Sequence, residues 1–84
     1  MVSTILKVLA QESAVGTGGE NFNGNTLIRV YNNTASDVSV LVKDAGANIT
    51  GSFTLRSYET VFVRKLPAEN IFGTVNLRMV PVSF

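Results

Sequence analysis

The chain has 84 residues and a mass of 9.0 kDa, which is enough for one small domain. It contains no cysteine and no histidine, so disulfides, cysteine–histidine metal sites, thiol nucleophiles and the commonest general base are excluded. The net charge of +1, with acidic and basic residues interspersed, argues against a nucleic-acid-binding protein. No apolar run is as long as a membrane-spanning helix, which needs about 20 residues.

The chain begins with an apolar, β-branched stretch at residues 3–9, which predicts a strand; a helix over residues 5–13 is the alternative on propensity. Lys7 lies inside this stretch rather than before it, so we expect no secretory signal and synthesis in the cytoplasm of a host cell. Residues 16–25 are mostly glycine and asparagine. They predict a flexible loop over residues 10–25, with Phe22 as its one large apolar side chain.

Five further segments read as strands, separated by turn-forming residues at 32–37 and 44–48. They are residues 26–31, 38–43, 48–56 (a weaker pair, with Gly51 as a bulge or turn), 59–65 and 74–80. Alternation along them predicts a core built from Val38, Val40, Val42, Val61, Val63, Val75, Leu77 and Met79. Pro67 should end one strand, and Pro81 suggests that the final residues lie at a sheet edge.

Short strands with turn signals every 8–12 residues or so are typical of a sandwich or small barrel. We therefore predict an all-β fold, a small antiparallel β-sandwich or barrel of about six to seven short strands, as a single domain over residues 1–84. A domain of this size buries so little apolar surface that its free energy of unfolding as a monomer is expected to be small. Because 45% of the residues are hydrophobic and 15% charged, we expect extra stability from association, as a homo-oligomer or in many copies on a larger body.

No cluster of side chains in the sequence indicates catalysis. The six acidic residues are dispersed, and the glycine-rich run lacks the Lys-Ser/Thr and the helix of a phosphate-binding loop. We therefore predict no enzyme activity, no cofactor and no bound metal. One alternative is a single-strand nucleic-acid platform, formed if basic side chains from separate strands converge near Tyr31, Tyr58 and Phe72. The basic residues in question are Lys43, Arg56, Arg64, Lys65 and Arg78.

The stretch at residues 59–74, ETVFVRKLPAENIFGT, predicts a strand, a proline-fixed corner and an apolar return. We expect Glu69 to lie at the surface of this corner, where its charge contributes little to stability. Phe72 should fold back onto the sheet with Ile71 and be buried.

Four segments carry a resemblance to a known family. They are LIRVYN at 27–32, GSFTL at 51–55, ETVFVRKLPAENI at 59–71 and VPVSF at 80–84. Together they resemble small virion structural proteins of tailed bacteriophages, chiefly those that infect marine cyanobacteria. The most specific piece is the corner at 65–71, where the family pattern is Lys-x-Pro-x-Asp-Thr-Ile. Glu69 and Asn70 replace the Asp-Thr pair here, which keeps the charge and loses the hydroxyl.

The resemblance implies a non-enzymatic virion protein, such as a capsid decoration (cement) protein that binds the outside of the shell and stabilises capsomer contacts. Its partners would be the major capsid protein or other virion subunits. The alternatives are a neck, tail or fibre-associated component, and a cell-surface carbohydrate-binding β-module. The last would need a pair of exposed aromatic rings, for which only Tyr31, Tyr58 and Phe22 are candidates.

The predicted partner interface combines the loop at 10–25 with the first strand, which could add to a neighbour's sheet. Phe22 would be its apolar anchor. The residues assigned to this interface are Phe22, Ile5, Val8, Asn23 and Asn25.

Overall fold

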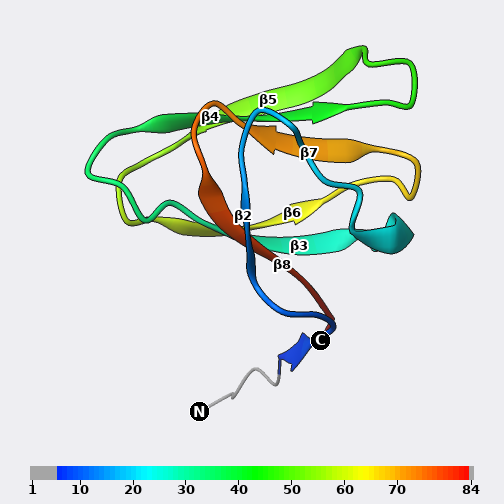
Figure 1. Cartoon of the computed structure of the whole chain (residues 1–84), viewed down its shortest axis with the longest axis horizontal. Coiled ribbons are helices and arrows are strands. Elements are labelled where there is room, and N and C mark those ends of the chain that lie inside the picture. Colours follow the sequence, from blue (N-terminus) through cyan, green and yellow to red (C-terminus); the bar gives the residue numbers. More distant parts are fainter. Residues whose placement is uncertain (1–5, 84) are drawn as a thin grey trace.

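Two antiparallel sheets pack face to face in the computed structural model, which describes residues 6–83 (Figure 1). The predicted all-β class is confirmed, and because both sheets are open the architecture is a sandwich. The strands are β1 (Lys7–Val8), β2 (Ser13–Val15), β3 (Leu27–Tyr31), β4 (Val38–Lys43), β5 (Ile49–Leu55), β6 (Thr60–Arg64), β7 (Asn70–Gly73) and β8 (Leu77–Ser83). A single turn of 3-10 type, η1 (Phe22–Gly24), stands between β2 and β3.

The larger sheet is organised around β8, which has neighbours on both sides. β3 pairs with one side of β8 and with the outer strand β6, whereas β1 and β2 pair one after the other along the second side. Pro81 itself is therefore not at a sheet edge, whereas the residues after it, Val82 and Ser83, pair with β1 alone among the described residues. Pro81 lies inside β8, opposite Ile28 of β3.

Pro81 is tolerated inside the sheet because the strand beside it is interrupted. The backbone N–H of Leu9 donates to the carbonyl oxygen of Pro81 at 2.9 Å, and regular pairing resumes only where Ser13 lies opposite Met79. A residue's N–H and C=O point to the same side of a strand, so the missing donor of Pro81 also faces this interruption. Residues 10–12 bulge outward at the place where a continuous strand would lack a hydrogen-bond donor.

The smaller sheet has the order β5-β4-β7. β5 is one continuous strand, so the prediction of a weak pair divided at Gly51 is wrong. Gly51 lies within the ladder opposite Val42, and the register shift falls next to it, where Ile49 pairs with Lys43 and Thr50 is the extra residue. The chain between β2 and β3 reaches this sheet as well, because Glu20 and Ile71 exchange both backbone hydrogen bonds at 3.0 Å.

The core lies between the two inner faces and follows the predicted alternation with one exception. Val38, Val40, Val42, Leu77 and Met79 are buried, and Val61 and Val63 pack against them in part. Val75 is 45% exposed, so its assignment to the core is wrong. The last strand begins at Leu77 rather than at residue 74, and Val75 belongs to the turn that precedes it.

Asn32 is fully buried where β3 ends and connects both sheets. Its side-chain Nδ2 donates to the carbonyl oxygens of Ser36 (2.8 Å), Arg56 (3.0 Å) and Leu55 (3.2 Å). Its Oδ1 accepts from the backbone N–H and the hydroxyl of Thr34 at 3.0 and 2.7 Å. One amide side chain therefore supplies most of the hydrogen bonds of the turn at 32–37.

The corner at 65–71 is built differently from the sequence expectation. Glu69 is buried rather than exposed, at 9% of its accessible surface. Its carboxylate accepts from the backbone N–H of Leu66 at 2.7 Å and from the hydroxyl of Thr50 at 2.5 Å. The hydroxyl that the corner lacks in its own sequence is thus supplied by the bulge residue of β5.

Phe72 is also placed differently from the prediction. Ile71 enters the core with no exposed surface, whereas Phe72 points to the outer face of the smaller sheet and is only half-buried. This follows from strand alternation, because neighbouring residues of β7 must point to opposite faces. The ring packs against Gly19, where any side chain would collide with it, and Lys43 Nζ lies 4.6 Å from the ring centroid.

Glu69→Gln should lower the melting temperature at neutral pH, because a neutral amide accepts weaker hydrogen bonds than a carboxylate. The hydroxyl of Thr50, followed by the N–H of Leu66, lowers the pKa of Glu69 in the folded protein. A depressed folded pKa gives stability that is present above the unfolded pKa, near 4.5, and is lost as the pH falls through the folded value. The melting temperatures of wild type and variant should therefore converge at acidic pH.

Glu59→Gln is the matched control for this measurement, because Glu59 is exposed and accepts one backbone hydrogen bond, from Arg56 at 3.1 Å. It should change the melting temperature less than Glu69→Gln does. Identical melting curves for wild type and Glu69→Gln at neutral pH would contradict the role assigned to the buried carboxylate.

Candidate functional site

A pocket of about 220 Å³ lies beside the interruption between β1 and β2. Its wall on one side is the outward bulge of the chain together with Pro81, and on the other side it is η1 and the residues around it. The lining residues are Leu9, Ala10, Gln11, Ser13, Glu20, Phe22, Asn23, Asn25 and Pro81. Small-molecule and cofactor sites are typically about 300–1,000 Å³. This pocket is smaller and suits a single side chain of a partner better than a cofactor.

A left-handed turn places the η1 wall of the pocket. Phe22, Asn23 and Gly24 have φ angles of 60°, 55° and 77°, a conformation that a bulky residue such as phenylalanine seldom adopts. Asn21 holds the turn in place from both sides. Its Oδ1 accepts the N–H of Gly24 at 2.7 Å, and its Nδ2 donates to the carbonyl oxygen of Pro67 at 2.7 Å. The turn is therefore fastened to the corner at 65–71.

Two charged residues, Glu20 and Lys65, belong to the loop and to the corner that adjoin the pocket. Glu20 lines it, and its carboxylate accepts the backbone N–H of Phe22 at 3.1 Å. Lys65 is almost fully buried, at 2% exposure, and its ammonium group donates to the carbonyl oxygen of Leu66 at 3.4 Å. Burial lowers the pKa of Lys65, and the nearby carboxylates of Glu69 and Glu20 oppose that shift. Hydrogen bonds of Asn21 join the loop to the corner, since its Nδ2 also donates to the carbonyl oxygen of Glu69 at 3.0 Å.

The structure brings together three of the five residues predicted for a partner interface. Phe22, Asn23 and Asn25 line the pocket. Val8 lies on β1, outside the pocket lining, and is 57% exposed. Ile5 lies outside the described residues.

Phe22 itself is not the protruding anchor that the sequence suggested. Its side chain is buried and belongs to the hydrophobic core of the chain. The turn that fixes it also gives a defined structure to part of the segment at 10–25, which further contains β2 and the backbone bridge to Ile71. Phe22 is only 7% exposed, so little of it is open to a partner, and the mobility of the loop in solution stays a prediction.

Leu9, Ala10 and Gln11 lie within the segments predicted for the interface, but sequence reasoning did not single them out and did not predict the β1–β2 interruption that brings them to the pocket. The signal that could have found them is Pro81, since a proline inside a central strand requires the neighbouring strand to break. Leu9, which lines the pocket, is 39% exposed, and the neighbouring Val8 of β1 is 57% exposed. We call Val8 and Leu9, together with the pocket, the β1 surface.

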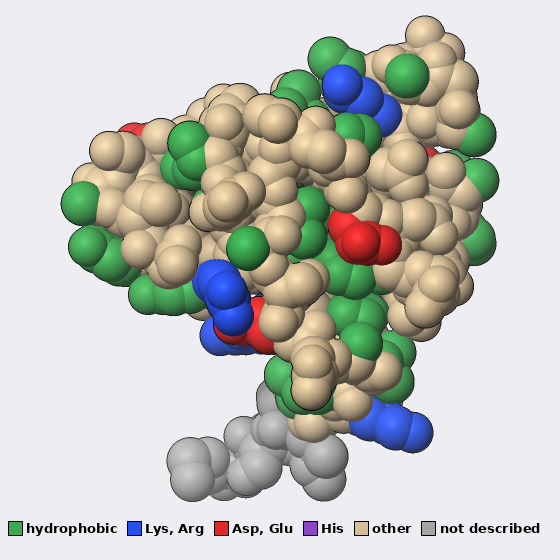
Figure 2. Space-filling model, in the orientation of Figure 1, with side chains coloured by type: hydrophobic (Ala, Val, Ile, Leu, Met, Phe, Trp, Pro, Cys, Tyr) green, Lys and Arg blue, Asp and Glu red, His purple; other side chains and the backbone are tan. Residues whose placement is uncertain are grey.

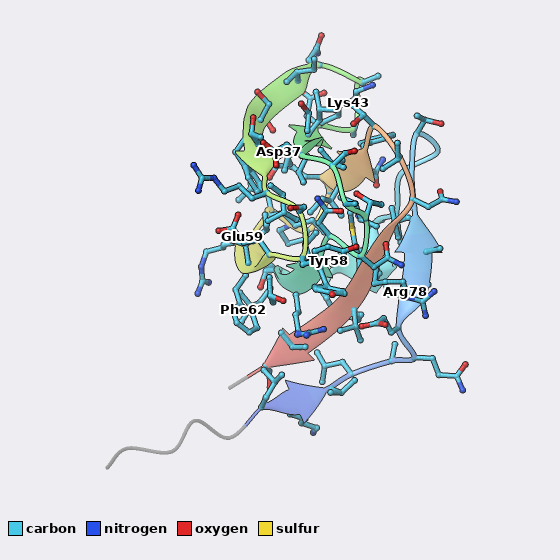
Figure 3. The ribbon with its side chains drawn as sticks, turned by 90° about the vertical axis from the view of Figure 1, so that its left-hand side faces the viewer. Asp37, Lys43, Tyr58, Glu59, Phe62 and Arg78 are labelled. Carbon is cyan, nitrogen blue, oxygen red and sulfur yellow. The ribbon has the colours of Figure 1, made fainter. Side chains whose placement is uncertain are left out.

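The basic residues considered for nucleic-acid binding do not converge. Lys43 lies over Phe72 on the smaller sheet, and Figure 3 shows it apart from Arg78, which lies near the middle of the view on the larger sheet. Arg78 and Arg29 share the carboxylate of Glu12 on the outer face of the larger sheet, at 3.0 and 3.3 Å. In the view of Figure 2 the charged side chains are scattered rather than gathered into one patch.

Comparisons with protein-family models, with curated protein sequences and with solved structures gave no match. Within residues 6–83 no group of acidic side chains gathers closely enough to hold a metal ion, and no helix is long and apolar enough to cross a membrane.

Proposed function

We propose that this chain is a non-enzymatic virion structural protein of the capsid decoration class, which binds the outer surface of a shell in many copies. The observation that carries the proposal is the β1 surface. β1 and the end of β8 form an arm that projects from the body of the sandwich, and Val8 and Leu9 expose their side chains on it (Figure 1).

Such an arm suits a structural subunit for two physical reasons. A small domain buries only a limited apolar area in its own core. Apolar side chains that stay exposed in the free protein add stability only when a partner covers them. A short two-strand arm also offers unpaired backbone groups along β1, which a neighbouring sheet can bind by strand addition. The pocket beside the arm would receive one side chain of the shell protein.

The competing functions draw on other features. A carbohydrate-binding module would use exposed aromatic rings. Of the three predicted candidates, Phe22 is buried, Tyr31 is half-buried and Tyr58 is 62% exposed; Phe62 of β6, at 44%, is a further exposed ring. A neck, tail or fibre component would use the same β1 surface as a decoration protein. Copy number separates these two, because a decoration protein is present in numbers comparable to the shell subunit.

Val8→Asp should abolish binding to shells that have been prepared without this protein. An exposed side chain changes stability little when replaced, so the variant should fold, whereas a carboxylate buried in the contact should weaken binding by at least about tenfold. Purified wild type and variant are added to the shells, and bound protein is quantified by gel after sedimentation.

Val75→Asp provides the matched control, since Val75 is an exposed valine at the other end of β8. It should bind as the wild type does. The proposal would be overturned by wild-type protein that does not bind the shells. Equal binding of Val8→Asp and wild type would exclude the β1 surface, and a copy number far below that of the shell subunit would favour the neck or tail.

A further inference from the structure

The outer edges of the two sheets differ in how they are protected against further strand pairing. Among the described residues, β5 pairs only with β4 and β6 pairs only with β3. β6 is preceded by Glu59 and ends in Arg64, two exposed charges that discourage pairing with another chain. β7 is covered by its bridge to Glu20, β2 is only three residues long, and β1 is the edge that the proposed shell contact would cover.

β5 has none of these protections. It is seven residues long, its sequence ITGSFTL contains no charge and no proline, and most of its residues are exposed. A long, uncharged edge strand is a ready template for pairing with another strand. Only the bulge at Thr50 interrupts it, and this lies toward one end.

The backbone of β5 presents hydrogen-bonding groups to the outside. Thr74 donates its N–H to the carbonyl oxygen of Ser39 at 3.1 Å, so the backbone of Ser39 faces β7 and that of its neighbours in β4 faces β5. Through the register of the hairpin, the N–H and C=O of Ser52 and Thr54 then point away from β4. These groups are positioned to extend the sheet.

Gly51 is the second, independent observation. Glycine weakens a strand and usually marks a bulge, a positive φ or a close approach by another group. The bulge falls at Thr50 instead, the φ of Gly51 is not positive, and a side chain placed there would meet nothing within 4 Å. The fold of the single chain therefore gives no reason for a glycine, whereas a close neighbour outside the chain would.

We propose that a second copy of this chain adds its β5 to this edge, antiparallel, about a two-fold axis near Ser52 and Phe53. The two smaller sheets then become one continuous sheet through an isologous contact. With the axis at Ser52 the residue opposite Gly51 is Phe53 of the second copy, and with the axis at Phe53 it is Leu55. In either register the glycine leaves room for a large apolar side chain.

A second copy fits this edge better than an unrelated strand because the ends of β5 are complementary in charge. In the antiparallel arrangement, Arg56 of one copy reaches the level of residues 48–50 of the other. Asp44 lies at that end, where its carboxylate accepts from the N–H and the side chain of Asn48 at 2.9 and 3.4 Å. The two-fold axis brings this opposite-charge pair together twice.

The test replaces Ser52, which is exposed and close to the two-fold axis, by lysine in one variant and by glutamate in another. Sedimentation of the free protein over a range of concentrations should show a wild-type dimer. Each variant alone should dissociate at least about tenfold more readily, because like charges meet across the contact. An equimolar mixture of Ser52→Lys and Ser52→Glu should restore a dimer containing one copy of each.

Thr60→Lys and Thr60→Glu are the matched controls, because Thr60 is exposed on the protected edge strand β6. They should dimerise as the wild type does. Wild-type protein that stays monomeric at the highest attainable concentration would overturn the inference. Ser52 variants that dimerise with wild-type affinity would overturn it as well. The experiment needs no shell, so its failure would leave the proposed virion function open to its own test.

Discussion

Val40→Asp is expected to abolish folding. Val40 is fully buried in the middle strand of the smaller sheet, and a carboxylate there would have no partner. An uncompensated buried charge costs more than about 4 kcal/mol. A chain of 84 residues has a total stability of roughly 4–13 kcal/mol, at 0.05–0.15 kcal/mol per residue. The circular dichroism spectrum and the loss of a cooperative denaturant transition report the outcome.

Ser39→Asp is the control that separates the effect of burying a carboxylate from the effect of introducing one. Ser39 precedes Val40 in β4 but points to the outer face and is exposed. The same carboxylate in this position should leave a folded protein whose stability differs by about 0.5 kcal/mol or less. A soluble Val40→Asp protein with the wild-type transition would show that the inner face of β4 has been assigned incorrectly.

Asn32→Ala is expected to lower the free energy of unfolding by about 3–5 kcal/mol. Each hydrogen bond contributes roughly 0.5–1.5 kcal/mol, and buried partners that lose a bond add the cost of their desolvation. The variant removes three bonds to carbonyl oxygens and two that the side-chain oxygen accepts. The free energy of unfolding is measured from urea denaturation at equilibrium.

The adjacent asparagine provides the comparison. Asn33 is exposed, so Asn33→Ala should shift the denaturation midpoint by an amount equivalent to about 0.5 kcal/mol at most. Similar midpoints for the two variants would mean that the network around Asn32 contributes little, and that the turn at 32–37 is stabilised by its backbone alone.

The alternation of apolar and polar residues correctly predicted which side chains of a strand face the core. Val38, Val40 and Val42 were placed correctly because β4 is buried on one face only, so that every second side chain is apolar. The same rule misplaced Val75, since alternation does not show where a strand begins. The chain turns before Leu77, and that turn is determined by the neighbouring sheet.

Interactions between distant segments could not be read from the sequence. The burial of Glu69 depends on Thr50, and the sequence gives no sign that these residues meet. The pocket depends on the pairing of β1 and β2 with opposite ends of β8 around Pro81. Three of the five predicted interface residues line it because the loop composition was informative, whereas the burial of the Phe22 ring depends on contacts with the core.

The central position of β8 has a consequence for how the chain acquires its structure. β4 and β5 form a local hairpin, but Val30 of β3 pairs with Met79 of β8, which lies 49 positions later. During synthesis, β8 leaves the ribosome after every strand it pairs with. Until then, the backbone hydrogen-bonding groups on one side of β3 have no partner strand. Sheets that rely on such distant pairings fold slowly, in milliseconds to seconds. A chain truncated before residue 77 should therefore form the hairpin of the smaller sheet but not an ordered larger sheet, because it lacks the middle strand.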